Sequence, residues 1–139
     1  MTDRSIGTPI DEAEREMGAT LAPRFDANGL VTAVVTDADD GTVLMLAHMD
    51  ADALARTIKT GEAHFFSRSR RRLWKKGETS GNVLDVETAR IDCDQDAVWL
   101  TARIRGSGVA CHTGARSCFY RRIESGPDGK PRLVHETSR

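Results

Sequence analysis

The sequence predicts an α+β domain with a mainly antiparallel β-sheet and few helices. Short runs of β-branched and apolar residues recur along the chain, and turn residues separate neighbouring runs. Only two segments have helical spacing or helix caps. With 139 residues, of which 39% are hydrophobic, the chain is long enough for one compact domain with a core and is short for two.

The first part of the chain is predicted to hold an arm followed by a β-hairpin. Residues 1–24 carry two prolines and many charges, so we expect a variable arm with at most a short helix at residues 11–17. Residues 30–36 are rich in β-branched side chains, and the Asp-Asp-Gly sequence at 39–41 provides a turn into residues 43–47. These two runs are expected to begin the central sheet.

A second helix is expected over residues 51–59. Asp50 can accept hydrogen bonds from the first free N–H groups of this helix, and Gly61 can adopt the left-handed conformation that ends it. Leu54 and Ile58 are four residues apart and therefore share one helix face. We expect this face to cover one side of the sheet.

The remaining segments predict strands and loops in alternation. In chain order they are an aromatic strand at 63–67, a basic segment at 68–76, a polar loop at 77–82, strands at 83–91 and 97–104, and a final strand at 118–123. The folded domain is expected to span residues 25–123. Residues 124–139 are weakly patterned and are expected to form a tail.

The overall charge and the apolar pattern exclude some function classes. Lys and Arg number 20 against 21 Asp and Glu, which argues against a general electrostatic attraction to nucleic acid or to an anionic membrane. No apolar run approaches the roughly 20 residues needed to cross a bilayer, and the N-terminal residues lack a signal-peptide core. We therefore expect a cytoplasmic protein with no membrane or nucleic-acid partner, whose three cysteines remain thiols.

Three carboxylates are concentrated in residues 92–96. In an extended chain alternate residues share a face, so Asp92, Asp94 and Asp96 would crowd together while Cys93 would point to the other face. A hard cation such as Mg²⁺ would neutralise the repulsion between these carboxylates. The alternative interpretation is a solvated acidic turn between two strands.

The cysteines are candidates for a second metal site. Cys93, Cys111 and Cys118 lie beside polar or small residues, which favours metal ligation over burial as small hydrophobic side chains. Three thiolates would leave the fourth position of a tetrahedral zinc open, and hydrolysis requires such a position. His112 follows Cys111 directly and is of a residue type suited to proton transfer, although a structural histidine is the alternative.

A basic segment concentrates positive charge in an otherwise balanced chain. Residues 67–77 carry six Lys and Arg side chains, and arginine forks bind phosphate bidentately. Trp74 can stack on a base, while Thr79 and Ser80 can hold a second phosphate through hydroxyl groups and backbone amides. An RNA-binding loop would use the same chemistry, and a solvated basic loop is a further alternative.

Six blocks of the sequence together resemble the phosphoribosyl-AMP cyclohydrolase family. In family order, they are residues 44–49, 60–64, 67–70, 73–81, 92–96, and 110–114 with 116–120. The resemblance covers roughly residues 25–121 and leaves the arm and the tail unexplained. It implies hydrolytic opening of the adenine ring of 1-(5-phosphoribosyl)-AMP between ring nitrogen 1 and carbon 6, the third step of histidine biosynthesis.

The resemblance also implies an intertwined homodimer with active sites at the subunit interface. Each subunit would hold one zinc, bound by Cys93 of one chain and by Cys111 and Cys118 of the other. The aspartates of residues 92–96 would bind magnesium, and His112 would be catalytic. The candidates for substrate contact are Arg68, Arg70, Trp74, Lys75, Thr79 and Ser80.

The chain departs from the family pattern at positions outside the proposed metal ligands. His48 stands where the family often has tyrosine, the pair Phe65-Phe66 replaces one that often includes tyrosine or tryptophan, and Arg71-Arg72 adds positive charge. These departures bear on ring stacking and substrate affinity. Many relatives also carry a downstream pyrophosphohydrolase domain, and the few residues after Tyr120 predict the monofunctional form.

Two other function classes remain open at this point. A zinc nucleobase deaminase performs related chemistry, but that class uses a His-x-Glu element followed by a Cys-x-x-Cys pair, and this chain has neither. A zinc-stabilised RNA-binding module could use the basic segment. Such a module would hold zinc with four protein ligands and would bind RNA with a steep dependence on salt.

Overall fold

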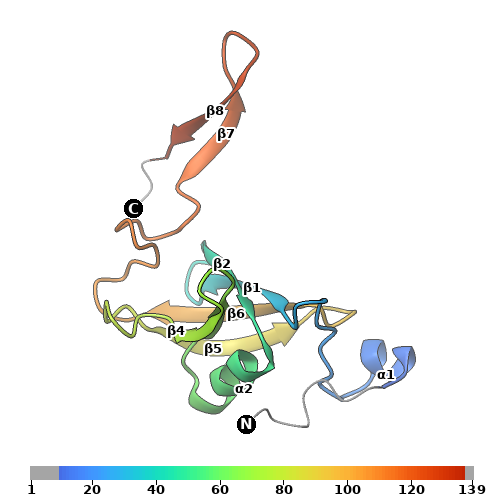
Figure 1. Ribbon diagram of the computed structural model, residues 1–139. Helices are drawn as coiled ribbons and strands as arrows, with labels where there is room; N and C mark the ends of the chain where they lie inside the picture. The colour runs from blue at the N-terminus through green and yellow to red at the C-terminus, as the bar shows by residue number, and fades with distance from the viewer. Residues whose placement is uncertain (1–9, 137–139) are drawn as a thin grey trace.

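A four-stranded sheet forms the centre of the fold in the computed structural model, which describes residues 10–136. The strand order is β2-β1-β6-β5 (Figure 1). Its strands are β1 (Val31–Asp37), β2 (Val43–Met49), β5 (Leu84–Ile91) and β6 (Ala97–Ile104). These strands confirm the predicted hairpin near residues 30–47 and the two strands predicted at 83–91 and 97–104.

The sheet is mixed, so the prediction of a mainly antiparallel sheet holds only in part. β1 and β2 are antiparallel, as are β5 and β6, but β1 and β6 run parallel, with Val35 opposite Leu100. Strands in a parallel pair cannot be joined by a short turn, and their pairing is set by the packing of distant segments. The local sequence pattern therefore carried no signal for it.

The hydrophobic core lies on one face of this sheet. Side chains that point to this face alternate along β1, where Val31, Ala33 and Val35 are buried. α2 (Ala51–Thr60) and β3 (His64–Ser67) contribute to the same core, and α2 lies on one side of the sheet (Figure 1). The largest fully buried hydrophobic side chains are Phe65, Leu44, Met49, Leu84 and Leu100.

The helix α2 begins and ends where its caps predict. The Asp50 carboxylate accepts a hydrogen bond from the Ala53 N–H group at 2.8 Å, and Gly61 ends the helix with a left-handed φ of 74°. The predicted apolar face is correct for Leu54, which is buried, but wrong for Ile58, which is 53% exposed.

Thr57 takes the buried position that Ile58 was expected to have. Its hydroxyl group donates to the Ala53 carbonyl at 2.9 Å and accepts a hydrogen bond from the His64 N–H group at 2.9 Å. This polar pairing ties α2 to β3 and satisfies a buried hydroxyl group. A hydrophobicity pattern alone cannot anticipate it.

Two hairpins and a short helix complete the described structure. They are α1 (Glu12–Met17), the β3–β4 hairpin with β4 at Arg72–Lys75, and the hairpin of β7 (Arg121–Ser125) and β8 (Pro131–His135). α1 and β3 were predicted, whereas β4 lies in the predicted basic segment and β8 in the predicted tail. The predicted final strand at 118–123 begins only at Arg121.

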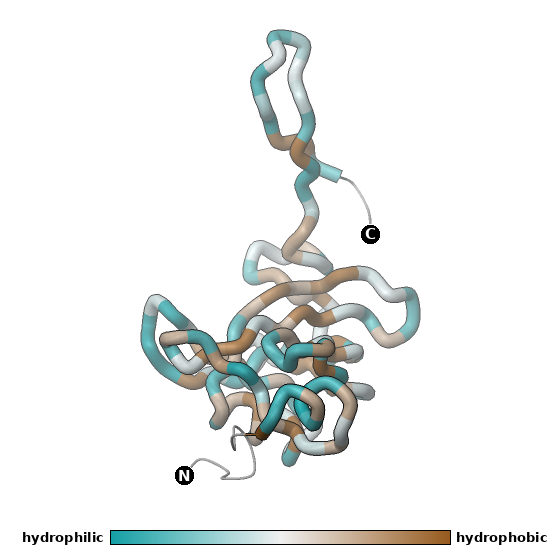
Figure 2. The backbone as a smooth tube through the Cα atoms, turned by 90° about the vertical axis from the view of Figure 1, so that its right-hand side faces the viewer, coloured by the Kyte–Doolittle hydropathy of each residue, from teal (hydrophilic) through white to brown (hydrophobic). Residues whose placement is uncertain are grey.

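The β7–β8 hairpin, here called the projecting hairpin, stands clear of the rest of the fold. Figures 1 and 2 show it extending from the body in two views at right angles. Ile123 and Leu133 face each other across its two strands and are 76% and 52% exposed. Two-stranded hairpins are marginally stable alone, so this one needs further contacts to be firmly held.

The second face of the central sheet is open and partly apolar. Val34 lies between Leu46 on β2 and Trp99 on β6 in one cross-strand row, and Leu46 and Trp99 are 49% and 43% exposed. We call this surface the open face. Within residues 10–136 there is no helix long and apolar enough to cross a bilayer. The first nine residues of the predicted arm and the last three of the predicted tail lie outside the described residues.

Candidate active site

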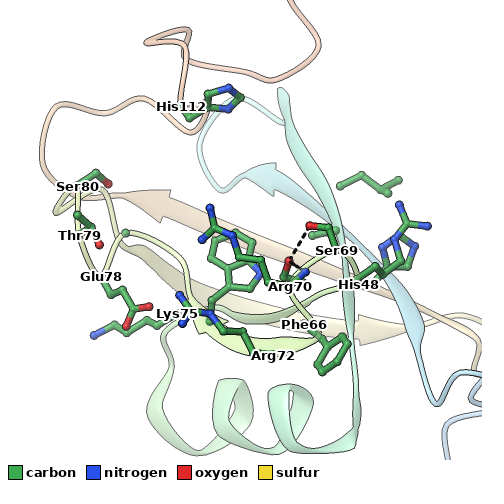
Figure 3. Close-up of a pocket in the computed structure, with 16 residues that line it drawn as sticks. His48, Phe66, Ser69, Arg70, Arg72, Lys75, Glu78, Thr79, Ser80 and His112 are labelled. Carbon is green, nitrogen blue, oxygen red and sulfur yellow. Dashed lines mark hydrogen bonds between the residues drawn. The ribbon is translucent and has the colours of Figure 1, made fainter.

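A cavity of about 760 Å³ lies between the end of β2, the β3–β4 hairpin, the loop of residues 77–82 and the loop after β6. Every residue predicted to contact substrate lines it, and so does His112. Figure 3 shows His48 and Ser69 on one side of this cavity and Glu78, Thr79 and Ser80 on the other. The structure therefore brings these predicted residues together.

The β3–β4 hairpin supplies the positive charge of the cavity. Phe65 and Trp74 face each other across the two strands, and their ring centroids are 5.3 Å apart. This pair anchors the hairpin to the core because Phe65 is fully buried. In the connecting turn, the Arg70 N–H group donates to the Ser67 hydroxyl at 3.2 Å, and Arg71 has a left-handed φ of 54°. The turn places Arg68 and Arg70 at the cavity wall.

The two lysines after Trp74 have different environments. Lys75 lines the cavity but forms an ion pair of 2.8 Å with Glu62. The Lys76 ammonium donates to the carbonyl of Ala110, next to Cys111, and lies 5.9 Å from the centroid of the Trp74 ring. Lys76 was not among the predicted site residues, yet it connects the basic hairpin to the loop that carries the cysteines.

His48 lines the cavity wall opposite the loop of residues 77–82, here called the hydroxyl-bearing loop because it carries Thr79 and Ser80. Burial lowers the pKa of His48, and the nearby positive charge of Arg68 lowers it further. The neutral imidazole is therefore favoured and can both donate and accept a hydrogen bond. At the sequence level this residue was noted only as a departure from the family pattern.

The hydroxyl-bearing loop is closed by its own backbone. Gly81 donates to the carbonyl of Gly77 at 2.8 Å, and Gly77 has a φ of 84°. A Cβ atom at Gly77 would lie 2.4 Å from the backbone of Asn82, so only glycine fits this close approach. The loop thus presents Thr79 and Ser80 to the cavity from a compact turn.

Cys111 and Cys118 come together in the loop after β6, here called the thiol loop (residues 110–118). Burial alone would raise the pKa of Cys111, but hydrogen bonds from the side chain and backbone of Thr113, together with one from Cys118, lower it. The Thr113 hydroxyl lies 3.0 Å from the Cys111 sulfur. Burial and the adjacent Cys111 raise the pKa of Cys118 to about 11. Cys111 is therefore the more acidic of the two neighbouring thiols.

The thiol loop is attached to β2 and to the β1–β2 turn. The Cys118 N–H group donates to the Leu44 carbonyl at 2.8 Å, and the Ser117 hydroxyl donates to the Val43 carbonyl at 2.6 Å. The Arg116 guanidinium lies 2.9 Å from the Asp40 carboxylate. These contacts hold both cysteines near the start of β2.

The three aspartates converge as predicted, but the reason is different. One carboxylate oxygen of each lies within 4.8 Å of the others. The segment is a tight turn between β5 and β6, here called the acidic turn (residues 92–96), and the parity argument from an extended strand was therefore wrong. The Asp92 carboxylate accepts hydrogen bonds from the N–H groups of Asp96 at 3.0 Å and Ala97 at 3.1 Å. Gln95 has a left-handed φ of 58°, which closes the turn.

The carboxylates of the acidic turn repel each other without a cation. Hydrogen bonds to Asp94 and Asp92, together with burial and their negative charge, raise the pKa of Asp96 to about 6. A hard divalent cation takes oxygen ligands and would remove this repulsion. The donor set therefore fits Mg²⁺ and does not fit a soft, thiophilic ion.

Cys93 does not join the other two cysteines within one chain. The Cys118 N–H group is hydrogen-bonded to Leu44, near the start of β2. The acidic turn that contains Cys93 leads directly into Ala97, and Ala97 lies in the same row of the sheet as His48, near the end of β2. Leu44 and His48 are four positions apart on β2, or about 13 Å at about 3.3 Å per residue. Two sulfurs bound to one zinc lie only about 4 Å apart.

Comparison with known proteins identifies the family. A family model described as phosphoribosyl-AMP cyclohydrolase matches residues 45–120, which is more than half of the chain. A relative of that name from Chelativorans sp. is 62% identical over 124 residues, covering 89% of this chain and 88% of the relative. The chain belongs to the phosphoribosyl-AMP cyclohydrolase family. The resemblance seen in the sequence is thereby confirmed.

Other members of the cyclohydrolase family are also similar over most of their length. A relative from Rhizorhabdus wittichii is 68% identical over 123 residues, covering 88% of this chain and 95% of the relative. Another from Rhodopseudomonas palustris is 57% identical over 135 residues, covering 97% of this chain and 89% of the relative. The alignments therefore extend beyond the family model into the arm or the tail.

Proposed function

We propose that this protein hydrolyses 1-(5-phosphoribosyl)-AMP at the bond between ring nitrogen 1 and carbon 6. The product is the phosphoribosylformimino-AICAR-phosphate of the third step of histidine biosynthesis. The observation that carries this proposal is the single cavity that gathers arginines, hydroxyl groups, an aromatic ring and His112. Its volume of about 760 Å³ suits a small-molecule substrate. Membership of the family supplies the substrate's identity.

The two sides of the cavity suit the two phosphates of this substrate. Arg68 and Arg70, in the turn of the β3–β4 hairpin, line the cavity and can bind one phosphate bidentately. Thr79 and Ser80, on the side opposite His48 and Ser69, can hold the second through hydroxyl groups and backbone amides. Trp74 also lines the cavity and can stack on the purine. Phosphates held at both ends would fix the ring between these walls.

His112 is proposed to move the proton that the reaction requires. Water adds to carbon 6, the bond from carbon 6 to ring nitrogen 1 breaks, and ring nitrogen 1 takes up a proton. Carbon 6 keeps its exocyclic nitrogen and becomes a carboxamide, so no ammonia is released. His112 lines the cavity on an exposed part of the thiol loop, from which an imidazole can reach bound substrate.

Cys111 and Cys118 are proposed to hold zinc together with Cys93 of a second copy. The support is that Cys111 and Cys118 interact and that the pKa of Cys111 is lowered, as expected of a metal-binding thiol. Bound zinc supplies a Lewis acid that makes water a nucleophile near neutral pH. Thiol ligands require a reducing compartment, and we therefore also propose that the protein works in the cytoplasm.

The acidic turn is proposed to bind magnesium with Asp92, Asp94 and Asp96. The close carboxylates and the raised pKa of Asp96 support this assignment. A divalent cation there would offset most of the negative charge of the turn and could approach a substrate phosphate. The two metals are thus expected at donor sets of different chemistry, oxygen in the acidic turn and sulfur in the thiol loop.

We further propose that the functional form is a homodimer whose interface contains the active site. Three features support it: Cys93 is distant from Cys111 and Cys118 in one chain, the open face carries exposed Leu46 and Trp99, and the projecting hairpin lacks support from its own body. Contiguous exposed apolar surface often marks a site of contact with another protein. In a two-fold symmetric dimer the same surface of both copies forms the interface, and each copy would supply the missing thiol to the other.

An absorbance assay with purified zinc-loaded protein, Mg²⁺ and 1-(5-phosphoribosyl)-AMP tests the proposed reaction. We expect formation of the ring-opened carboxamide, its loss in Cys111→Ala, and a kcat about 100-fold or more lower in His112→Asn with KM little changed. Circular dichroism would verify that both variants fold. No turnover by folded, metal-replete wild type would contradict the proposal. RNA binding with a steep salt dependence would then favour the RNA-binding module.

A further inference from the structure

Gln95 occupies an unusual position in the centre of the acidic turn. It has a φ of 58°, a left-handed conformation in which side chains other than glycine, asparagine and aspartate are uncommon. Its polar side chain is only 4% exposed. A strained backbone together with a buried amide indicates that surrounding contacts determine this conformation.

Those contacts come from residues 15–24, the segment that follows the first turn of α1. The Gln95 side-chain oxygen accepts a hydrogen bond from the Ala22 N–H group at 2.8 Å. Its amide nitrogen donates to the carbonyls of Arg15 at 2.9 Å and Thr20 at 3.1 Å. The backbone carbonyl of Gln95 accepts from the Arg24 N–H group at 2.6 Å. Four hydrogen bonds thus hold one residue of the acidic turn.

The same residue also belongs to the hydrogen bonds that shape the turn. The Gln95 N–H group donates to the Asp92 carbonyl at 3.1 Å, and its chain neighbours Asp94 and Asp96 carry two of the three carboxylates. A rotation of the Gln95 backbone would therefore move both carboxylates relative to Asp92. Because Asp92, Cys93 and Asp96 are exposed and Asp94 is only half-buried, Gln95 is the main connection of the turn to a buried environment.

We infer that Gln95 is a positioning residue through which residues 15–24 hold the carboxylates of the acidic turn in place for a divalent cation. The segment is thereby part of the metal site although it supplies no ligand. This inference rests on the proposed role of the acidic turn. Outer partners that orient metal ligands change metal affinity by about 10- to 100-fold when they are removed.

The variant Gln95→Gly separates the side-chain contacts from the backbone conformation. Glycine adopts the left-handed conformation without strain, so the turn can still form, but all three side-chain hydrogen bonds are lost. We expect the full-length variant to bind Mn²⁺, a probe that takes the same oxygen ligands as Mg²⁺, about 10-fold more weakly in a titration followed by electron paramagnetic resonance. Raised Mg²⁺ should restore its kcat.

Arg71→Gly is the matched control, because Arg71 is the other non-glycine residue with positive φ in residues 10–136 and lies outside the acidic turn. It should bind Mn²⁺ like the wild type. Gln95→Asn, whose amide is one methylene too short to reach the same partners, should resemble Gln95→Gly. Wild-type Mn²⁺ affinity in Gln95→Gly would overturn the inference, because the carboxylates would then keep their arrangement without these contacts.

Amide hydrogen exchange tests the positioning separately from metal binding. In metal-free Gln95→Gly, the N–H groups of Asp96 and Ala97, which donate to Asp92, should exchange at least several-fold faster than in the wild type. Unchanged exchange would overturn the inference. If exchange accelerates but neither wild type nor Asp94→Asn binds Mn²⁺, the positioning is supported as a structural property, and the proposed cation role of the acidic turn fails instead.

Discussion

Lys75 forms an ion pair of 2.8 Å with Glu62, so a lysine predicted to contact phosphate already has a carboxylate partner. Glu62 also binds Arg105, and both partners lower the pKa of Glu62. By contrast, the structure gives no ion pair for Arg70 among residues 10–136, and Arg70 lines the same cavity. The two cations should therefore differ in their contribution to substrate binding.

We predict that Arg70→Ala raises KM roughly 10- to 100-fold, because a charge-assisted hydrogen bond to phosphate is lost. Lys75→Ala should raise KM by less than about 5-fold, because its charge is largely compensated by Glu62. Steady-state kinetics of both variants against the same substrate would measure the difference. Equal increases in KM would show that Lys75 leaves Glu62 to bind phosphate.

Zinc sharing between subunits predicts complementation between two inactive variants. Cys93→Ala and Cys118→Ala should each be inactive, because either one removes a ligand from every site. After subunits of the two variants exchange in equal amounts, half of the dimers are mixed, and one of their two sites is intact. Activity should therefore recover to about a quarter of the wild-type value.

The control for this mixing is Cys111→Ala with Cys118→Ala, two variants that remove ligands from the same chain's thiol loop. Their mixed dimers contain no complete site and should stay inactive. Native mass spectrometry would verify that exchange has occurred. Exchange without recovery in the first mixture would contradict the sharing of zinc between chains.

The projecting hairpin should contribute to the dimer. We predict that Ile123→Ser combined with Leu133→Ser weakens self-association, because both side chains are exposed on the hairpin of one chain and become available to a second copy. Sedimentation velocity at decreasing protein concentration would detect the shift towards monomer. Arg132→Ser, on the other face of the same hairpin, is the control and should have little effect.

The raised pKa of Asp96 predicts a specific dependence of stability on pH. The folded protein keeps a proton on Asp96 up to about pH 6, whereas the ordinary value is 3.8. Between these values the folded state binds more protons than the unfolded state, so this group makes metal-free protein less stable as pH rises. Mg²⁺ should cancel the loss by replacing the proton.

Thermal unfolding of the wild type and Asp96→Asn in chelator, between pH 4.5 and pH 7, would measure this effect. The difference between the two melting temperatures should move in favour of Asp96→Asn as pH rises through about 6. A constant difference across this range would show that Asp96 is not perturbed in the folded protein. Added Mg²⁺ should reduce the advantage of the variant.

The sequence predicted those parts of the structure that local interactions determine. Asp50 and Gly61 bound α2 correctly because helix caps act within a few residues. The chain segments that line the cavity were also predicted, since family resemblance marked them. By contrast, the parallel pairing of β1 with β6 depends on packing between distant segments, and β8 is a surface strand without a buried face.

The acidic turn shows where local reasoning was insufficient. The argument from strand parity assumed an extended chain, but Gln95 adopts the left-handed conformation that sequence patterns assign to glycine or asparagine. Hydrogen bonds between the Gln95 side chain and Arg15, Thr20 and Ala22, which are far away in sequence, stabilise this conformation. No short motif encodes such a contact, and the same holds for the pairing of Lys76 with the thiol loop.

Arg116 connects the thiol loop to the β1–β2 turn and should therefore affect zinc more than global stability. Its guanidinium contacts Asp40 at 2.9 Å and the Thr42 hydroxyl at 3.2 Å, while its carbonyl accepts the Ala110 N–H group at 2.9 Å. Asp40 is half exposed, so loss of the ion pair should cost less than about 1 kcal/mol of unfolding free energy.

We predict that Arg116→Met binds zinc about 10-fold more weakly, because the loop that carries Cys111 and Cys118 loses its lateral support. Competition with a chromophoric chelator would measure the affinity, and urea denaturation would measure stability. Arg122→Met is the matched control, since Arg122 of the projecting hairpin makes comparable exposed ion pairs with Glu124 and Glu136. Equal zinc affinity in the two variants would show that the thiol loop keeps its geometry without Arg116, and that the bonds of Cys118 and Ser117 to β2 are sufficient to hold it.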